Sequence, residues 1–345
     1  MATRTIGSGG NDANIATWEA GLGTLSAQQT GDLLAQAFAE SPIFSGSVTT
    51  STFYAHLQAQ SGAQHDGRAH AVSGDGNARI TGTGGALSCV DSRDDHFRFS
   101  WFEIAGPGNN DLPCIRVESV AAAGEIQVHH LLIHNDDASA GGAQYGIYIN
   151  DVDVLAKCYR NIVYGVGYSG IGLSAMTTNS VVYNNTFWNC NNSASAFGGG
   201  IATSDTDALI EGNASFANSN LDIRNLAGTL DYNYTSDTTG DDEGTNGLAS
   251  LTTTDQFTNA TTTWASTDLT HKSGSNLAAA SVPTKSNSTY PEIDYAADNR
   301  NTAITGDWDV GACQYVAAGG STRGGPFGHR GTAFNGGRTF HGIIQ

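Results

Sequence analysis

Residues 146–216 read GIYINDVDVLAKCYRNIVYGVGYSGIGLSAMTTNSVVYNNTFWNCNNSASAFGGGIATSDTDALIEGNASF. A glycine followed by alternating apolar residues occurs here three times, at Gly146, Gly170 and Gly200, in steps of 24 (170 − 146) and 30 (200 − 170) residues. A polar turn, a second apolar run, and an asparagine with a later aromatic residue follow each glycine. The runs are Val154-Leu155, Val181-Val182 and Leu209-Ile210, and the pairs are Asn161 with Tyr164, Asn185 with Trp188, and Asn213 with Phe216. Such alternation, broken by Gly, Asn, Asp and Ser, predicts short β-strands joined by turns.

The repeat length predicts how these strands are arranged. A coil of this size with about three strands is the rung of a parallel β-helix, in which stacked coils bury a core that one coil alone cannot. We therefore expect an all-β parallel β-helix. The alternative is a β-sandwich, which seldom repeats a whole unit at a near-fixed step. The recurrent asparagines are expected in left-handed turn positions, which Asn tolerates better than most residues.

Both ends of the chain resemble a known class of solenoid. The opening Thr5–Gly10, followed by Ile15–Glu19, resembles that of right-handed parallel β-helix proteins of the pectate-lyase-like and tailspike-like type, and so do the closing residues Asp294, Arg300 and Trp308–Ala312. We expect the chain to come from a tailed bacteriophage. The resemblance implies a right-handed solenoid that starts with a strand and a short cap helix. It says little about function, because this fold hosts lyases, hydrolases and inert spikes.

The composition divides the chain into three parts. Residues 1–26 are expected to form the first strand and the cap helix, with Asp12 or Asn14 as the helix cap. Residues 27–316 form the predicted solenoid, in which 236–290 is either a coil laid along the body or an insertion, and 291–316 is a closing strand. Residues 317–345 form a Gly-rich tail with no acidic residue, interleaved with Arg and aromatic side chains.

The tail is predicted to dock onto other virion proteins or onto copies of the same chain, because a plain linker would not carry aromatic residues. Its candidate docking residues are Arg323, Phe327, Arg330, Phe334, Arg338, Phe340, Ile343 and Ile344. We accordingly expect a homo-oligomer.

Charge and composition exclude several classes of function. Fifteen Lys and Arg against 33 Asp and Glu give a net charge of −18, which disfavours nucleic acid as a partner. No apolar stretch is long enough to cross a membrane, and MATRTIGSGG lacks the apolar segment of a signal peptide. The five cysteines are far apart in sequence, so we expect buried thiols and neither a disulfide framework nor a metal site. No cofactor motif is present.

The candidate catalytic residues are weak. Asp151, Asp153, Asp205 and Asp207 could supply the carboxylates of a glycosidase or lyase, but they lie at turns, where Asp is favoured for its backbone hydrogen bonds. Strict alternation would place His130 and His134 on one strand face, where they could bind a metal with Asp136. Because no third ligand is placed by the spacing, stacked or solvated histidines on the outer face are expected instead.

Exposed aromatic residues provide candidates for glycan binding, namely Tyr145, Tyr148 and Tyr168. Together with the acidic body and the distinctive tail, they lead to the hypothesis of a structural surface protein of a phage virion, of head-decoration, fibre or tail-spike type. Such a protein would be made in the host cytoplasm, anchored through its tail, and in contact with a surface polysaccharide. The alternatives are a β-helix polysaccharide lyase or hydrolase, and a non-catalytic bacterial surface module that binds glycans.

Overall fold

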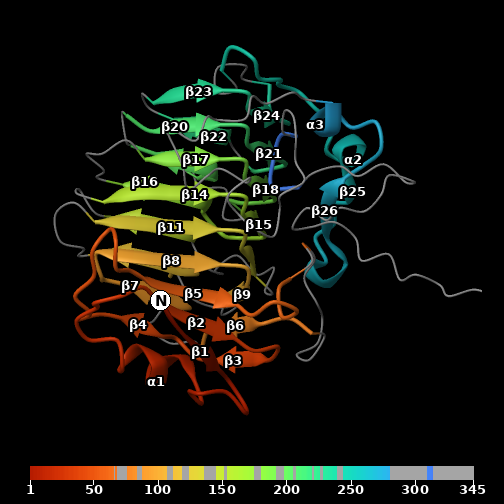
Figure 1. Ribbon diagram of the computed structural model, residues 1–345. Helices are drawn as coiled ribbons and strands as arrows, with labels where there is room; N and C mark the ends of the chain where they lie inside the picture. Colours follow the sequence, from red (N-terminus) through yellow and green to blue (C-terminus); the bar gives the residue numbers. More distant parts are fainter. Residues whose placement is uncertain are drawn as a thin grey trace, which may run out of the picture.

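The protein is a parallel β-solenoid, as expected, in a computed structural model that describes residues 1–65, 67, 76–83, 88–106, 112–118, 124–135, 145–150, 154–174, 180–191, 198–204, 207–219, 221–225, 228–238, 244–279 and 309–313. Each coil visits three parallel sheets in the same order, and we number the sheets in that order. Figure 1 shows the coils stacked along one axis, with the N-terminal strands at the bottom.

The strands of each sheet are stacked in the order of the sequence. Sheet 1 contains β1 (Ala2–Ile6), β2 (Gln29–Leu33), β5 (Ala55–Ala59), β8 (His96–Ser100), β11 (Glu125–His129), β14 (Leu155–Tyr159), β17 (Val181–Tyr183), β20 (Leu209–Glu211) and β23 (Thr229–Asp231). Sheet 2 contains β3 (Ala37–Ala39), β6 (Arg79–Thr81), β9 (Glu103–Gly106), β12 (Leu132–Asn135), β15 (Ile162–Tyr164), β18 (Thr186–Trp188), β21 (Ala214–Phe216) and β24 (Tyr234–Thr235). Sheet 3 contains β4 (Ile43–Phe44), β7 (Val90–Ser92), β10 (Ile115–Glu118), β13 (Tyr145–Asn150), β16 (Ser169–Ser174), β19 (Gly199–Thr203) and β22 (Leu221–Asn225).

The strand registers confirm most of the predicted repeat. Ile147, Ile171 and Ile201, each the residue after a repeat glycine, are aligned across β13, β16 and β19. The three aromatic residues after the asparagines are likewise aligned across β15, β18 and β21. One part of the repeat was aligned wrongly: Val181 and Val182 do not pair with Val154 and Leu155, but with Lys157 and Cys158.

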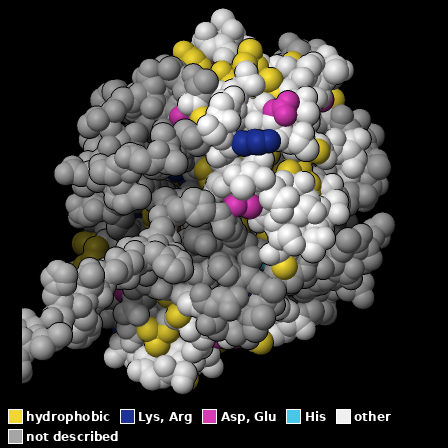
Figure 2. Space-filling model, turned by 90° about the vertical axis from the view of Figure 1, so that its right-hand side faces the viewer, with side chains coloured by type: hydrophobic (Ala, Val, Ile, Leu, Met, Phe, Trp, Pro, Cys, Tyr) yellow, Lys and Arg dark blue, Asp and Glu magenta, His cyan; other side chains and the backbone are white. Residues whose placement is uncertain are grey.

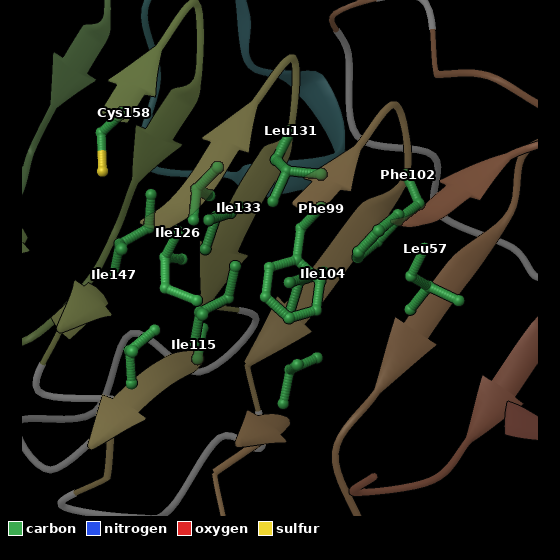
Figure 3. Packing of buried hydrophobic residues seen from close by; sticks show 14 of the residues in the cluster. Leu57, Phe99, Phe102, Ile104, Ile115, Ile126, Leu131, Ile133, Ile147 and Cys158 are labelled. Atoms are coloured by element: carbon green, nitrogen blue, oxygen red, sulfur yellow. The ribbon is translucent and has the colours of Figure 1, made fainter. Parts of the chain in front are cut away.

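The core runs through the middle of the solenoid and takes side chains from all three sheets. Figure 3 shows Ile126 and Cys158 of sheet 1, Ile133 of sheet 2, and Ile115 and Ile147 of sheet 3 converging in this interior, and all five are fully buried. Burial of this apolar surface is the main source of stability in such a stack. One rung alone cannot bury its inward side chains, so the core depends on contacts between neighbouring rungs.

The repeat glycines are required by this core. A Cβ on Gly170 would collide with the ring of Phe187, and one on Gly146 would collide with Val163. The repeat glycines therefore mark the points where side chains of sheet 2 approach the backbone near the start of each strand of sheet 3.

The recurrent asparagines form a buried ladder between sheets 1 and 2. Each stacks on the next through its side-chain amide, in the order Asn161, Asn185, Asn213 and Asn233. Asn185, for example, accepts from the backbone N–H and the amide of Asn161 at 3.0 and 2.9 Å and donates to the carbonyl of Cys158 at 2.9 Å.

The prediction that these asparagines adopt left-handed backbone conformations was wrong. The left-handed position is one residue earlier and is occupied by Arg160 (φ 52°), Asn184 (φ 50°) and Gly212 (φ 66°). The asparagine recurs because its side chain satisfies backbone groups in the bend, which a buried turn cannot leave unpaired.

The N-terminal end is closed by helix α1 (Ile15–Glu19), as predicted. Asn14 is its N-cap and accepts a hydrogen bond from the backbone N–H of Thr17 at 2.8 Å. Asp12 has a different role, because it forms an ion pair with Arg4 at 2.6 Å. Trp18 of α1 is buried and packs over Gly31 of β2, so the helix covers the end of the core.

Residues 251–279 and 309–313 lie along the outside of the body, and we call them the outer strap. The strap contains α2 (Thr253–Gln256), the antiparallel pair β25 (Phe257–Asn259) and β26 (Asp268–His271), the short 3₁₀ turn Trp264–Ser266, and α3 (Asn276–Ala279). Figure 1 shows these elements beside the stack, and Figure 2 shows that the described surface on this side is mostly uncharged. The expectation of a segment laid along the solenoid is thus confirmed for 251–279.

The strap is held by a second apolar cluster, in which Phe257 packs edge-on against Phe216 of β21 with ring centroids 5.2 Å apart. Most of the closing strand predicted for 291–316 lies outside the described residues, and the described part, 309–313, is not a strand. Within 309–313, the described part of that range, the Gly311 N–H donates to the carbonyl of Gly212 at 2.7 Å and the Ala312 N–H donates to Thr186 Oγ1 at 2.9 Å. These residues therefore dock on the side of the stack, against the rungs of β18 and β21, which immediately precede the rung of β24.

Candidate functional site

The three tyrosines predicted to face solvent come together on the outer face of sheet 3. Tyr145 and Tyr148 lie on β13, and Tyr168 directly precedes β16. The ring of Tyr145 is stacked on that of Tyr148, with centroids 4.5 Å apart and planes 26° apart. It also contacts the ring of Tyr168, with centroids 4.9 Å apart. The three rings thus form one continuous aromatic wall.

The wall exists because the next two rungs carry small residues. Tyr148 pairs in register with Gly172 of β16, which pairs with Ala202 of β19, which pairs with Arg224 of β22. A Cβ at Gly172 would lie 2.5 Å from the Tyr145 ring, so only glycine leaves room for that ring. Large side chains in place of Gly172 and Ala202 would point outward in line with Tyr148 and fill this space.

These residues line an open pocket of about 140 Å³, which we call the tyrosine pocket. It is lined by Tyr145, Tyr148, Tyr168, Gly172, Leu173, Ser174, Ala202, Thr203, Ser204 and Arg224. The described residues of its lining thus supply three phenol hydroxyls, three aliphatic hydroxyls and one guanidinium, and they include no carboxylate.

The electrostatics of the pocket keep the Tyr145 phenol neutral. Burial, together with the neighbouring phenols of Tyr168 and Tyr148, raises the pKa of Tyr145 well above its ordinary value. A neutral phenol can donate as well as accept a hydrogen bond, and its ring presents an apolar face. Arg224 adds a positive charge at the far end of the pocket, in a chain whose net charge is −18.

This arrangement is suited to binding. Stacked aromatic rings flanked by hydroxyl and guanidinium donors match ligands that combine a flat apolar face with a rim of hydroxyl groups. General acid–base catalysis of glycoside cleavage needs carboxylates or similar groups beside the scissile bond, and none occurs among the described residues of the lining.

Of the four predicted carboxylates, the structure describes only Asp207. Asp207 is exposed in the turn before β20 and does not line it. Asp151, Asp153 and Asp205 lie outside the described residues. So do all the candidate docking residues of the tail, Arg323, Phe327, Arg330, Phe334, Arg338, Phe340, Ile343 and Ile344.

The prediction that strict alternation orients the histidines was wrong. His129 ends β11, and His130 occupies a left-handed turn (φ 53°) before β12 begins, so the run is two strands with a bend and not one strand. His130 stacks on Trp101 with centroids 4.2 Å apart, and His129 stacks on Tyr159 at 4.7 Å. The expectation of stacked rings is therefore confirmed, but these rings are buried and not solvated.

His134 lies apart from these two and is fully buried on β12. Its Nε2 is 2.7 Å from Oε1 of Glu103 on β9, and its ring stacks on Tyr164. Asp136 lies outside the described residues. Within the described part of the chain, no group of three or more His, Cys, Asp and Glu side chains is placed to hold a metal ion.

Gly172, Ala202 and Arg224 were not predicted as parts of the site. A signal was available, because Tyr148, Gly172 and Ala202 each lie two residues after a repeat glycine. Aligning these positions places a large residue above two small ones on one outer face, which indicates a hollow.

No protein family model, no curated protein and no solved structure matches the chain. The parallel β-helix is therefore established by the structure of this chain itself, while the narrower pectate-lyase-like or tailspike-like family and the phage origin have no such support. None of the described helices is long and apolar enough to cross a lipid bilayer.

Proposed function

We propose that the chain is a structural surface protein, of the kind that forms the outer parts of a phage virion, and that its solenoid binds a surface polysaccharide in the tyrosine pocket. The observation that carries the glycan-binding part is the aromatic wall of Tyr145, Tyr148 and Tyr168 above the small residues Gly172 and Ala202. Sugar rings pack their apolar faces on such walls, while their hydroxyls bond to the polar rim.

Physical features of the body support a structural role. Stacked rungs, the asparagine ladder and the outer strap make a rigid solenoid with buried thiols at all five cysteines. The capped N-terminal end also protects the edge of the first rungs against pairing with other chains. Such a body carries a binding pocket in a fixed geometry, which reduces the ordering cost of ligand binding.

The glycan-binding part is tested by binding the full-length chain to immobilised bacterial surface polysaccharides. Tyr148→Ala should weaken binding at least tenfold, because a stacking face and its burial are lost. The matched control is Tyr54→Ala, whose ring instead lies under Arg98. Equal binding by wild type and Tyr148→Ala, or no binding to any polysaccharide, would contradict the proposal.

The same samples distinguish the enzyme alternative. If reducing ends or unsaturated sugars accumulate in solution, the chain is a hydrolase or lyase and not a purely structural protein. Asp205 is the first residue to replace in that case, since it directly follows Ser204 of the pocket lining.

Anchoring through residues 317–345 is the other part of the proposal, and it is supported by the basic, aromatic composition of this tail beside an acidic body. Sedimentation velocity of the full-length chain should show an assembly. Replacing Arg323, Arg330 and Arg338 together by Ser should shift this assembly towards monomer. A wild-type monomer that also fails to bind any other virion protein would contradict the anchoring role.

A further inference from the structure

The tyrosine pocket is short along the axis of the solenoid. The outward column of sheet 3 runs through Arg116, Tyr148, Gly172, Ala202 and Arg224 in register. Adjacent strands are about 4.8 Å apart, so the Cα atoms of Tyr148 and Arg224 are separated by roughly 14 Å. The small-residue floor between them is two rungs long.

Both ends of this floor carry a large side chain. At one end, the Tyr148 ring is fixed by stacking against Tyr145. Beyond it, Arg116 is held by Asp91 at 2.6 Å and by Glu118 at 3.0 Å, so the next rung continues the obstruction. At the other end, Arg224 lines the pocket from β22, which is the last strand of sheet 3.

The volume of the pocket, like the short floor of small residues, indicates a site for a small ligand. The pocket occupies about 140 Å³, whereas sites that enclose a drug-sized ligand occupy roughly 300–1,000 Å³. A polysaccharide lying along the axis would need a floor of small residues over many rungs, and sheet 3 provides only two of them here.

We propose that the tyrosine pocket takes a single sugar ring, presented as a chain end or a side branch, and not an internal stretch of a linear glycan. This inference rests on the glycan-binding function proposed above. The ring would stack on Tyr148 over Gly172 and Ala202, with a hydroxyl or acidic substituent directed at Arg224.

A chain-length series tests this reading with the full-length protein. The probes are linear oligosaccharides of two, four and eight identical units, from neutral glucans and from oligogalacturonides, and the measurement is the dissociation constant per molecule. If the pocket binds only a chain end, every oligosaccharide offers one binding position, so the dissociation constant should be the same for two, four and eight units. If the pocket binds internal units, longer chains offer more binding positions per molecule, so the dissociation constant should fall at least fourfold from two to eight units.

Variants make the test specific to the pocket. Arg224→Ala should weaken binding about tenfold, because a hydrogen bond to a charged donor is lost. Arg98→Ala, on the outer face of sheet 1, is the control and should leave the constant unchanged. A binding series whose constant falls with chain length would overturn the single-ring inference and leave the glycan-binding proposal in place. No binding by any probe, with none on the polysaccharide array either, would overturn both.

Discussion

Gly172→Ala is the sharpest perturbation of the tyrosine pocket, because its effect can be worked out from the structure. The new Cβ would lie 2.5 and 2.6 Å from two carbons of the Tyr145 ring and 3.1 Å from Cδ2 of Tyr148. Non-bonded carbons prefer separations of roughly 3.5–4.0 Å, so the Tyr145 ring must move by about 1 Å. That ring is also in contact with Tyr148 and Tyr168, so the whole wall must shift.

The energetic consequence of this substitution divides into two parts. Overpacking costs about 1–3 kcal/mol, while replacing a strand glycine by alanine recovers about 0.5–1 kcal/mol of backbone entropy. Folding stability should therefore fall by at most about 2.5 kcal/mol. Binding should fall at least tenfold, which is about 1.4 kcal/mol, because the added methyl group occupies the floor of the pocket.

Isothermal titration calorimetry with the best polysaccharide fragment and thermal unfolding of the same samples separate these two effects. Gly21→Ala is the matched control, because this exposed glycine after α1 has only ordinary contacts, the nearest at 3.4 Å from the Trp18 carbonyl oxygen. Wild-type affinity in Gly172→Ala would refute the assignment of the floor of the pocket as the binding surface.

Three further predictions concern the body. Asn185→Ala leaves buried hydrogen-bonding partners of the ladder unsatisfied and should lower the stability of the solenoid by about 3–6 kcal/mol. Urea unfolding measures this loss, with the exposed Asn246→Ala as the control. Equal unfolding midpoints for the two variants would contradict the stabilising role of the ladder. Burial raises the pKa of the Cys158 thiol to about 12, so native protein at pH 8 should react with a thiol reagent only after unfolding, and rapid native labelling of this residue would contradict its burial. Burial and the nearby Asp237 raise the pKa of Asp222 to about 6, so this group should stabilise the fold by about 3 kcal/mol below pH 4 and lose that contribution as the pH rises through 6. A carbon-13 NMR titration of Asp222 should show the midpoint near 6, and a midpoint below 4 would mean that its hydrogen bonds outweigh burial.

The fold could be predicted from the sequence because its constraints are local and repeated. Gly146, Gly170 and Gly200 recur wherever a core side chain of sheet 2 approaches the backbone, and the asparagines recur wherever the bend between sheets 1 and 2 leaves backbone groups to satisfy. The backbone conformation of these asparagines was predicted wrongly because asparagine can stabilise a turn in two ways. Asparagine can itself adopt the left-handed conformation, but here it follows the left-handed residue and its side chain forms hydrogen bonds with backbone groups of the bend.

Other errors came from bends that alternation does not show. The left-handed His130 breaks a run of sequence that reads as one strand, so the faces of His129 and His134 could not be assigned by counting. The outer strap has few apolar residues and no period, and its docking depends on single contacts such as Phe257 on Phe216. Composition therefore left open whether this segment lies along the body or forms an insertion.

Only half of the candidate site was visible in the sequence. The three tyrosines are recognisable as exposed aromatic residues, but a pocket also needs an empty space beside them. That space depends on which residues of later rungs come into register, and the loops between the rungs differ in length. Gly172, Ala202 and Arg224 therefore acquire their role only through strand pairing.

The most direct test of the glycan-binding claim is a crystal structure of the full-length chain with the tightest-binding oligosaccharide. We expect one sugar ring stacked on Tyr148, lying over Gly172 and Ala202 and within hydrogen-bonding reach of Arg224. An oligosaccharide bound at another sheet or along the outer strap, with the tyrosine pocket left empty, would contradict it.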